Sequence, residues 1–347
     1  MLFVLLSATT AMTQIQTEWI DSTSHPEADV ALFFTNRPLE YKEDGSVTFK
    51  DKSTVQTDNL YFCMFDYNSD TIHLKYRAEN RSRQYPTQPV ENNFLYKALR
   101  NIRANHGITR FYFVIPGYSK TFETQVYDFM YRLKTTYGDS LRNSTAIIMY
   151  AWGDEWRPYR YYSAKVSAKR GGNDFAIFQH MLDEVLSDTT YVRNYLNDVE
   201  VNLVCTSMGN QLLKKYLQSR AKQEIPLVKT YNNINFIGSD AAWDSFEEDK
   251  GFDRIKELTD TVRIFVNSID GPLQMSQRLN SKPRMGLAGP VNPHELPGYI
   301  RIYMVTDLIS REDLGALGHD YLLRNPVITE SLRTTVEVKQ TSYRLEN

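Results

Sequence analysis

Eight apolar or alternating segments along the chain have the length and composition of β-strands. Two of them, residues 111–116 (FYFVIP) and 146–152 (AIIMYAW), are apolar almost throughout, which indicates strands covered on both faces. The predicted strands cover residues 30–35, 60–65, 111–116, 146–152, 199–205, 234–238, 262–267 and 299–305.

Segments of helical spacing lie between most of the later strands. Apolar residues recur every three or four positions in 121–133, 174–186 and 209–217, so each segment presents one apolar face. Strands that alternate with such helices predict an α/β fold with a mostly parallel sheet flanked by helices. The Pro- and Gly-rich stretch 279–297 predicts a long loop.

The first hundred residues differ, with short strands, charged turns and no helical pattern before Asn92. We expect one α/β domain over residues 15–347 that includes an N-terminal strand-rich extension of about 15–91, whose strands lengthen the sheet. Residues 1–14 (MLFVLLSATTAMTQ) resemble an export signal, although no Lys or Arg precedes the apolar run. This favours a periplasmic or secreted location over a cytoplasmic one. The run is too short to span a bilayer, so no transmembrane segment is expected.

Composition narrows the range of partners. Forty basic and 42 acidic residues give a net charge of −2, and no long run of one sign occurs, so no nucleic-acid partner is predicted. Two cysteines are too few for a disulfide framework or a thiolate metal site. Hydrophobic residues make up 41% of the chain, enough for a sizeable core.

The junction after the strand 199–205 carries the strongest chemical signal. The sequence VEVNLVCTSMGNQLL passes from strand to helix within a few residues, with Ser207 between them. So short a join predicts a strained turn that exposes the Ser207 hydroxyl beyond the carboxyl edge of the sheet. Gly209 supplies a small residue where helix and strand approach. The pattern is G-x-S-x-G with Cys205 in place of the first glycine, and taken alone it fits a polar loop residue equally well.

A nucleophilic serine needs a base and an acid that orients it. Of six histidines, His319 follows the last predicted strand, where serine hydrolases built on such sheets place their base. Two acids follow strands at the same edge, Asp240 after 234–238 and Asp270 after 262–267. Both give the chain order Ser, Asp, His. We prefer Asp270 because the acid usually follows the penultimate strand, and Asp240 stays as the alternative.

Two backbone N–H groups are predicted to form an oxyanion hole. Met208 follows the nucleophile and lies at the amino terminus of the predicted helix, where its N–H would point toward a developing oxyanion. The strand 111–116 runs directly into Gly117 and Tyr118. Tyr118 is the expected second donor, and Gly117 allows the backbone to approach closely.

With these residues in order, the sequence resembles the α/β-hydrolase superfamily, and more narrowly the bacterial alpha/beta hydrolase family of unknown function formerly called DUF900. The resemblance runs from about Ala31 to Pro326. It rests on the segments LFFTNR, VIPGYS, YAWGDEW, CTSMGN, GSDAAWDSF, VNSIDGPLQMS and GHDY. It implies an α/β-hydrolase fold with Ser207 as nucleophile, Asp270 as acid and His319 as base, and it implies no substrate.

Two positions depart from that family. Thr206 and Pro116 each stand where the family has His. Both are expected beside the oxyanion site, where they would change the polarity of the pocket. The aromatic segment that contains Trp152 and Trp156 either forms a wall of the substrate pocket or packs against the N-terminal extension.

The sequence therefore predicts a serine hydrolase of esterase or lipase type. The expected substrate is a small-molecule or lipid-like acyl compound, and the chemistry requires no metal or organic cofactor. Two alternatives stay open: a non-catalytic binding protein with the same fold, and an acyltransferase. The sequence gives no indication of oligomeric state.

Overall fold

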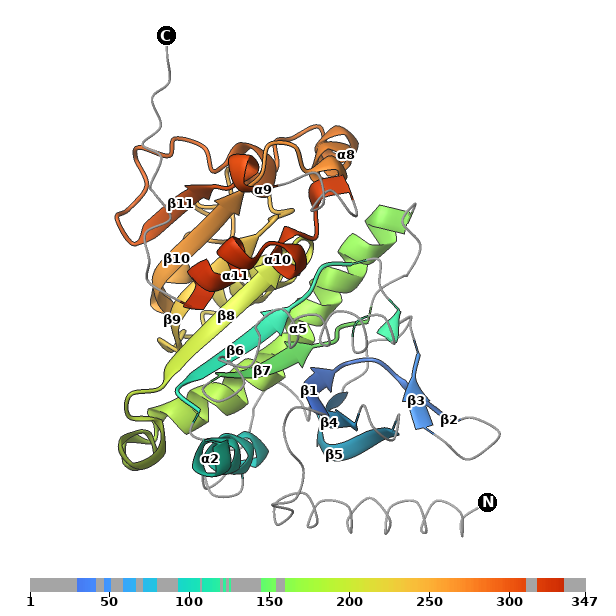
Figure 1. The fold of residues 1–347 in the computed structure, drawn as a ribbon, viewed down its shortest axis with the longest axis vertical. Coiled ribbons are helices and arrows are strands. Elements are labelled where there is room, and N and C mark those ends of the chain that lie inside the picture. Colours follow the sequence, from blue (N-terminus) through green and yellow to red (C-terminus); the bar gives the residue numbers. More distant parts are fainter. Residues whose placement is uncertain are drawn as a thin grey trace.

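A mixed nine-stranded sheet organises the protein, in the order β11-β10-β9-β8-β6-β7-β1-β4-β5 (Figure 1). The computed structural model describes residues 30–41, 47–50, 59–66, 71–79, 93–106, 108–118, 121–122, 125, 145–153, 160–309 and 317–333. The strands of this sheet are β1 (Val30–Thr35), β4 (Asn59–Asp66), β5 (Thr71–Glu79), β6 (Arg110–Ile115), β7 (Thr145–Tyr150), β8 (Glu200–Thr206), β9 (Tyr231–Ile237), β10 (Thr259–Val266) and β11 (Ile300–Met304). A separate two-stranded sheet joins β2 (Leu39–Tyr41) to β3 (Val47–Phe49).

From β1 to β11 all neighbouring strands run parallel, whereas β4 pairs antiparallel with both β1 and β5. The register sets Cys205 of β8 opposite Ile115 of β6 and Phe236 of β9. The loops that follow β6, β8, β9 and β10 therefore meet at one carboxyl edge, where open α/β sheets bind ligands.

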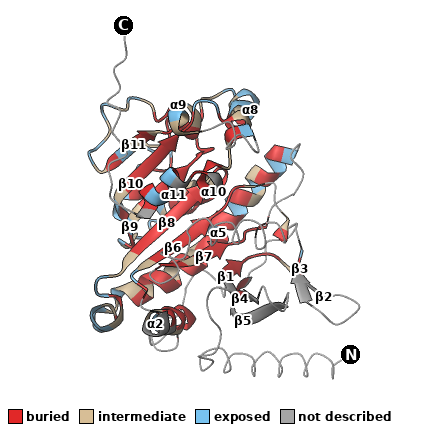
Figure 2. Cartoon of the chain, in the orientation of Figure 1, coloured by how far each residue is buried: buried red, intermediate tan, exposed pale blue. Residues whose placement is uncertain are grey.

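Helices cover both faces of the sheet, and the central strands between them are buried (Figure 2). On one face α2 (Phe94–His106), α5 (Tyr161–Ser187) and α7 (Gly209–Lys222) pack in one apolar core. On the other, α10 (Tyr321–Arg324) and α11 (Pro326–Arg333) pack on β6, β8, β9 and β10. The remaining helical segments are α6 (Thr189–Tyr191), η5 (Val192–Leu196), η6 (Ile255–Glu257), α8 (Gly271–Asn280), α9 (Met285–Ala288) and η7 (Thr306–Leu308).

The predicted fold class is confirmed: this is an α/β sheet, mostly parallel and flanked by helices, and strands of the N-terminal extension lengthen it. All eight predicted strands occur, with bounds that differ by up to three residues. The predicted signal segment 1–14 and most of the predicted helix 121–133 lie outside the described residues. Both cysteines are buried and free.

The predicted helix 174–186 begins much earlier, at Tyr161. Its added half contains Gly171 and Gly172, residues that weaken an isolated helix. In the structure this glycine pair is where α5 crosses α7, because a Cβ on Gly172 would lie 2.6 Å from the Leu212 carbonyl oxygen. Close packing between the two helices therefore outweighs the low helix propensity.

The predicted loop 279–297 is less irregular than its Pro and Gly content suggests. It contains α9, and α8 extends into it. Its backbone is bonded to the ends of β9 and β10: Gly286 N–H donates to Ser239 O, and Asn267 N–H donates to Gly286 O. A Cβ on Gly286 would lie 2.2 Å from the Ser239 nitrogen, so this glycine permits the docking.

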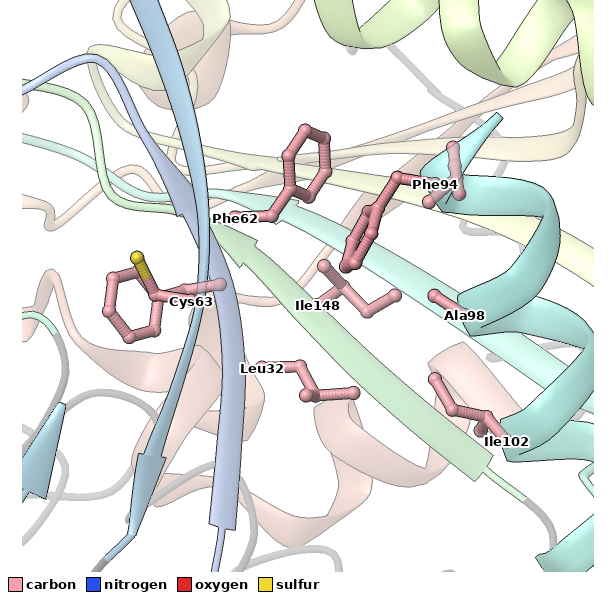
Figure 3. A pocket seen from close by; sticks show the side chains of 9 residues that line it. Leu32, Phe62, Cys63, Phe94, Ala98, Ile102 and Ile148 are labelled. Atoms are coloured by element: carbon pink, nitrogen blue, oxygen red, sulfur yellow. The ribbon is translucent and has the colours of Figure 1, made fainter. Parts of the chain in front are cut away.

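A small apolar cavity lies between the sheet and α2 (Figure 3). Its walls include Leu32, Phe62, Phe94 and Ile148. Its lining comes from β1, β4, β7 and α2, whereas the segment around Ser207 follows β8, on the far side of β6. This cavity is therefore part of the core packing and not part of the carboxyl-edge site.

One buried carboxyl lies where α5 packs against the start of β9. Asp183 Oδ1 accepts hydrogen bonds from Gln179 Nε2 and Thr230 Oγ1, both at 2.7 Å. Burial raises the pKa of Asp183 to about 6, and the two hydrogen bonds offset only part of that effect. Because the folded-state pKa lies above the unfolded value of about 3.9, the folded state binds more protons between these values, and stability falls as pH rises through that window.

The Asp183→Asn variant should remove this pH dependence, because an amide keeps the acceptor oxygen but carries no charge. Its free energy of unfolding relative to wild type should increase by about 1–3 kcal/mol between pH 4 and pH 7.5, measured by urea unfolding. Asp183→Ala, which also removes the acceptor, should be less stable than Asp183→Asn at both pH values. Parallel pH profiles for wild type and Asp183→Asn would contradict the assignment.

Candidate active site

Ser207 lies in the turn that joins β8 to α7, with a positive backbone φ of 50°. A non-glycine residue adopts this left-handed conformation only when its surroundings impose it. The Ser207 N–H donates to Ile237 O at 2.9 Å, and Ser207 O accepts from Asp240 N–H at 3.1 Å and Asn210 Nδ2 at 3.0 Å. Bonds to β9 and to α7 thus hold both sides of the turn.

Two glycines permit the close approach of backbones around Ser207. A Cβ on Gly209 would lie 2.4 Å from Ile115 O and 2.8 Å from Pro116 O, so α7 can begin only with a residue that lacks a side chain. A Cβ on Gly117 would lie 2.7 Å from Ser207 Cβ and 3.2 Å from its Oγ. The loop after β6 therefore packs directly against the serine side chain.

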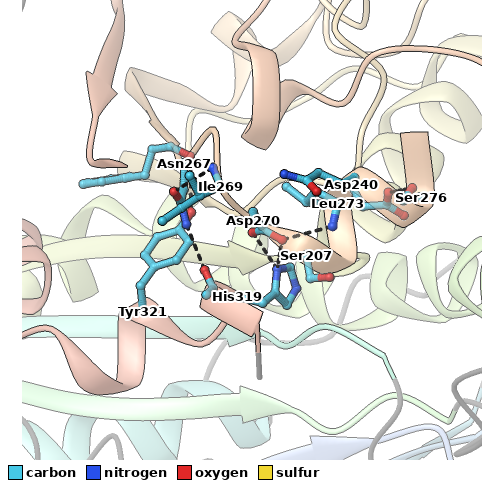
Figure 4. A network of polar contacts seen from close by, with 12 residues as sticks. Ser207, Asp240, Asn267, Ile269, Asp270, Leu273, Ser276, His319 and Tyr321 are labelled. Atoms are coloured by element: carbon cyan, nitrogen blue, oxygen red, sulfur yellow. Dashed lines mark hydrogen bonds and ion pairs between the residues drawn. The ribbon is translucent and has the colours of Figure 1, made fainter. Parts of the chain in front are cut away.

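The predicted base and acid are brought together. His319 Nδ1 lies 2.9 Å from Asp270 Oδ1 and 2.7 Å from Oδ2 (Figure 4). Asp270 is fully buried, and its Oδ1 also accepts from Leu273 N–H at 3.0 Å, which caps the amino terminus of α8. With Nδ1 facing a carboxylate, the ring presents Nε2 as its other nitrogen.

The His319 ring lies beside Ser207 in Figure 4, at the end of β9. Gly238 follows the carbonyl that bonds Ser207, and a Cβ on Gly238 would lie 3.3 Å from His319 Cε1. Within the described part of the chain, no hydrogen bond joins the Ser207 hydroxyl to the imidazole. In serine hydrolases this contact often forms fully only when substrate binds.

The electrostatic surroundings make the imidazole more basic. Burial alone lowers the pKa of His319, but the charge of Asp270 and its hydrogen bond act in the opposite direction and outweigh burial. Asp320 and Asp240 contribute in the same direction as Asp270. The net result is a pKa of His319 above its ordinary value.

Two residues that the sequence reasoning missed support the pair. Asn267 Nδ2 donates to Gly318 O at 2.9 Å, which ties the loop carrying His319 to the end of β10. Tyr321 is fully buried, and its hydroxyl would lie 3.4 Å from a Cβ on Gly238, below the same loop. In the sequence, only their proximity to the predicted acid and base could have indicated them, because each lies within three residues of Asp270 or His319.

Asp240, the alternative acid, takes part in a separate network (Figure 4). Its Oδ2 accepts from Tyr161 Oη at 2.8 Å, and its Oδ1 accepts from Ser276 Oγ. Burial raises the pKa of Asp240, against the effect of these bonds and of the nearby Arg284. The structure thus brings Asp270 to the imidazole and uses Asp240 to join α5 and α8 beside the turn.

Thr206, one of the two departures from the family pattern, bonds to the loop after β6. Its Oγ1 accepts from Gly117 N–H at 2.9 Å. The Gly117 N–H is therefore occupied. Among the residues that the structure describes, Met208 N–H has no hydrogen-bond partner, and this leaves it available to an oxyanion. Tyr118 follows Gly117 and packs edge to face on Tyr161, with ring centroids 5.9 Å apart.

The same loop is anchored from behind. Pro116, the other departure, is buried, and its carbonyl accepts from Trp152 Nε1 at 2.8 Å. Trp152 is fully buried, so the structure places it behind the loop, and Trp156 lies outside the described residues.

The segment that carries Trp152 is held in turn by the end of β1. Thr35 Oγ1 donates to Ala151 O at 2.6 Å, and Gly153 N–H donates to Asn36 Oδ1 at 3.0 Å.

The described segments contain no group of three or more His, Cys, Asp or Glu side chains placed to hold a metal ion. No helix in them has the length and apolar character needed to cross a bilayer.

The sequence matches the family described as "Alpha/beta hydrolase of unknown function (DUF900)" over residues 96–336, more than half of the chain. The protein belongs to this alpha/beta hydrolase family. The match includes the β8–α7 turn, both predicted acids and His319. A comparison with curated proteins found no match.

Solved structures show only distant similarity. An inhibited form of esterase B from Lactobacillus rhamnosis is 10% identical, with 96% of this chain and 93% of that chain covered and a TM-score of 0.33. The product of gene lin2722 from Listeria innocua is 14% identical, with 67% and 95% covered and a TM-score of 0.35. Both similarities are too distant to indicate an activity.

The Gly209 contact is directly testable. Alanine has the higher helix propensity, so Gly209→Ala should stabilise an unconstrained helix start by up to about 1 kcal/mol. The clash with the Ile115 and Pro116 carbonyls predicts instead a loss of about 2–4 kcal/mol in urea unfolding. Gly298 is the matched control, because a Cβ there would have no neighbour within 4 Å. Equal stability of the two alanine variants would show that the turn accommodates a Cβ at position 209.

Proposed function

We propose that the protein is a serine hydrolase that cleaves esters or related acyl bonds through an acyl-enzyme. The observation that carries the proposal is the His319–Asp270 pair, facing the left-handed Ser207 turn across the end of β9. A serine that only completes a loop would need neither a buried carboxylate–imidazole pair beside it nor the two glycines that let neighbouring backbone approach it so closely.

The geometry supports a defined proton path. With Nδ1–H donated to Asp270, His319 Nε2 is unprotonated and can accept the Ser207 proton as Oγ attacks the acyl carbon. The imidazolium then gives that proton to the leaving oxygen, which departs as an alcohol. Water, deprotonated by the same Nε2, then attacks the acyl-enzyme, and the imidazolium returns this proton to Ser207 Oγ as the acid is released. The raised pKa of His319 favours the first of these transfers.

The oxyanion of the two tetrahedral intermediates would lie between Met208 and the loop after β6. Met208 N–H is available to it, at the amino end of α7. We assign the second donor to Tyr118 N–H, because the neighbouring Gly117 N–H is bonded to Thr206. Thr206 is then a positioning residue, which holds the loop so that its next N–H faces the reacting carbonyl.

A fluorophosphonate probe tests the nucleophile, since it bonds covalently to an activated serine oxygen with loss of fluoride. Wild-type protein should be labelled, Ser207→Ala should not, and His319→Ala should react at least about 100-fold more slowly. Ser268→Ala, which removes an exposed serine two residues before Asp270, should be labelled at the wild-type rate. Undiminished labelling of Ser207→Ala would place the reactive serine elsewhere, whereas no labelling of folded wild type would favour a fold used only for binding.

Thr206 is tested by a pair of variants. Thr206→Val keeps the shape but removes the acceptor for Gly117 N–H, so the labelling rate should fall by about 10–100-fold, on the scale of one misplaced oxyanion donor. Thr206→Ser keeps the acceptor and should retain most of the wild-type labelling rate. The two variants should have similar melting temperatures, so that a difference in rate does not reflect a loss of folding. Similar rates for wild type and Thr206→Val would remove Thr206 from the mechanism.

A further inference from the structure

Exposed apolar side chains are concentrated beside the candidate active site. Among the described residues, the large apolar side chains that are exposed are Tyr162, Val166, Ile269, Met275, Leu279, Leu317 and Val327. Six of these residues lie in three neighbouring places. Tyr162 and Val166 lie on the first two turns of α5, and Met275 and Leu279 lie on α8. Ile269 precedes the cap of α8, and Leu317 lies two residues before His319.

These residues form one continuous stripe. Leu317 packs against Gly271 at the start of α8, because a Cβ on Gly271 would lie 2.9 Å from the Leu317 Cβ. Met275 and Leu279 follow Gly271 at four-residue spacing on the same face of that helix. Tyr162 Oη donates to Leu279 O at 2.6 Å, which brings α5 alongside. The stripe thus runs from the segment of the proposed base, across α8, to α5.

The two helical segments that carry most of the stripe are basic. Residues 160–173 and 271–284 contain Arg160, Lys165, Lys169, Arg170, Arg278, Lys282 and Arg284 and no Asp or Glu, in a chain whose net charge is −2. Arg160, Lys169, Arg170 and Arg278 are exposed, whereas Arg284 is buried and Lys282 pairs with Asp244. Exposed positions on α8 and on the adjoining turns of α5 are visible in Figure 2.

The two helical segments combine exposed apolar side chains with cations and contain no acidic residue, whereas Asp307 and Asp320 lie near the Ile269 and Leu317 end of the stripe. Apolar side chains beside cations on a helix are typical of helices that lie on anionic membranes. The apolar side chains enter the boundary of headgroups and acyl chains, and the cations face the phosphates. A nucleic acid would satisfy the cations but leave the stripe in water. Sequence charge alone does not reveal this face, because the two basic segments lie far apart in the chain and meet only in the fold.

We propose that the stripe, defined by Tyr162, Val166, Ile269, Met275, Leu279 and Leu317, docks the protein on an anionic lipid surface. Docking brings Leu317 and Ile269 into the lipid boundary, and these residues lie two and one positions before His319 and Asp270. The candidate site then opens toward lipid acyl groups. This last step rests on the proposed function, whereas the docking itself does not.

Flotation with vesicles tests the docking on the full chain. Wild type should float with phosphatidylglycerol vesicles, remain unbound with pure phosphatidylcholine vesicles, and lose binding as NaCl is raised. The double variants Met275→Gln/Leu279→Gln and Lys169→Gln/Arg170→Gln should each bind at least about ten-fold more weakly. Val327→Gln is the matched control, an exposed apolar residue outside the stripe, and should bind as wild type does.

Three results would overturn the proposal. One is a wild type that does not float with either vesicle. Another is binding that neither double variant weakens. The third is a wild type that dimerises through the stripe without floating, which would make the occupant a second copy of the chain.

Flotation and labelling distinguish a failure of the docking proposal from a failure of the proposed function. Ser207→Ala should float as wild type does, and the Met275→Gln/Leu279→Gln variant should keep its fluorophosphonate labelling rate. Docking without Ser207-dependent labelling would therefore reject the catalytic proposal alone.

Discussion

The left-handed backbone of Ser207 is the constraint on which the carboxyl edge depends. A serine gains nothing from this conformation by itself, and it persists because strand β9, helix α7 and the loop after β6 each hold the turn. Gly209 allows α7 to start against the carbonyls of Ile115 and Pro116, and Gly117 lets the next loop reach the serine side chain. The loop after β6, the end of β9 and the start of α7 are therefore all positioned against this turn.

The loop after β6 shows how far such support extends. Its Gly117 is held in front by Thr206 and its Pro116 from behind by Trp152, whose segment is bonded to the end of β1. A motif near residue 35 therefore helps to position backbone beside residue 207, although β7 and β6 lie between β1 and β8 in the sheet order. This gives a physical reason for a Thr-Asn-Arg ending on a strand that carries no reacting group.

Period and spacing along the chain were sufficient to predict the parallel sheet and the strand-to-helix turn, because both depend on local pattern. Chain order could also nominate His319 and two acids. It could not choose between the acids, nor foresee that Gly171 and Gly172 lie inside a helix, because those outcomes depend on contacts between distant segments. Thr206 is similar: the sequence shows it as a departure from a family pattern, and only its bond to Gly117 explains what a threonine does there.

The two buried carboxyls show how environment can separate groups that sequence leaves equivalent. Asp270 accepts from the imidazole and from the N–H at the start of α8, two donors suited to a charged carboxylate. Asp240 accepts from two hydroxyls, and burial raises its pKa above the ordinary value. Its bonds to Tyr161 and Ser276 engage both carboxyl oxygens and join α5 to α8, whereas Asp270 bonds the imidazole. The same junction aligns the two helices whose outer faces carry the apolar stripe, so the residue that is not bonded to the histidine still shapes the surface beside it.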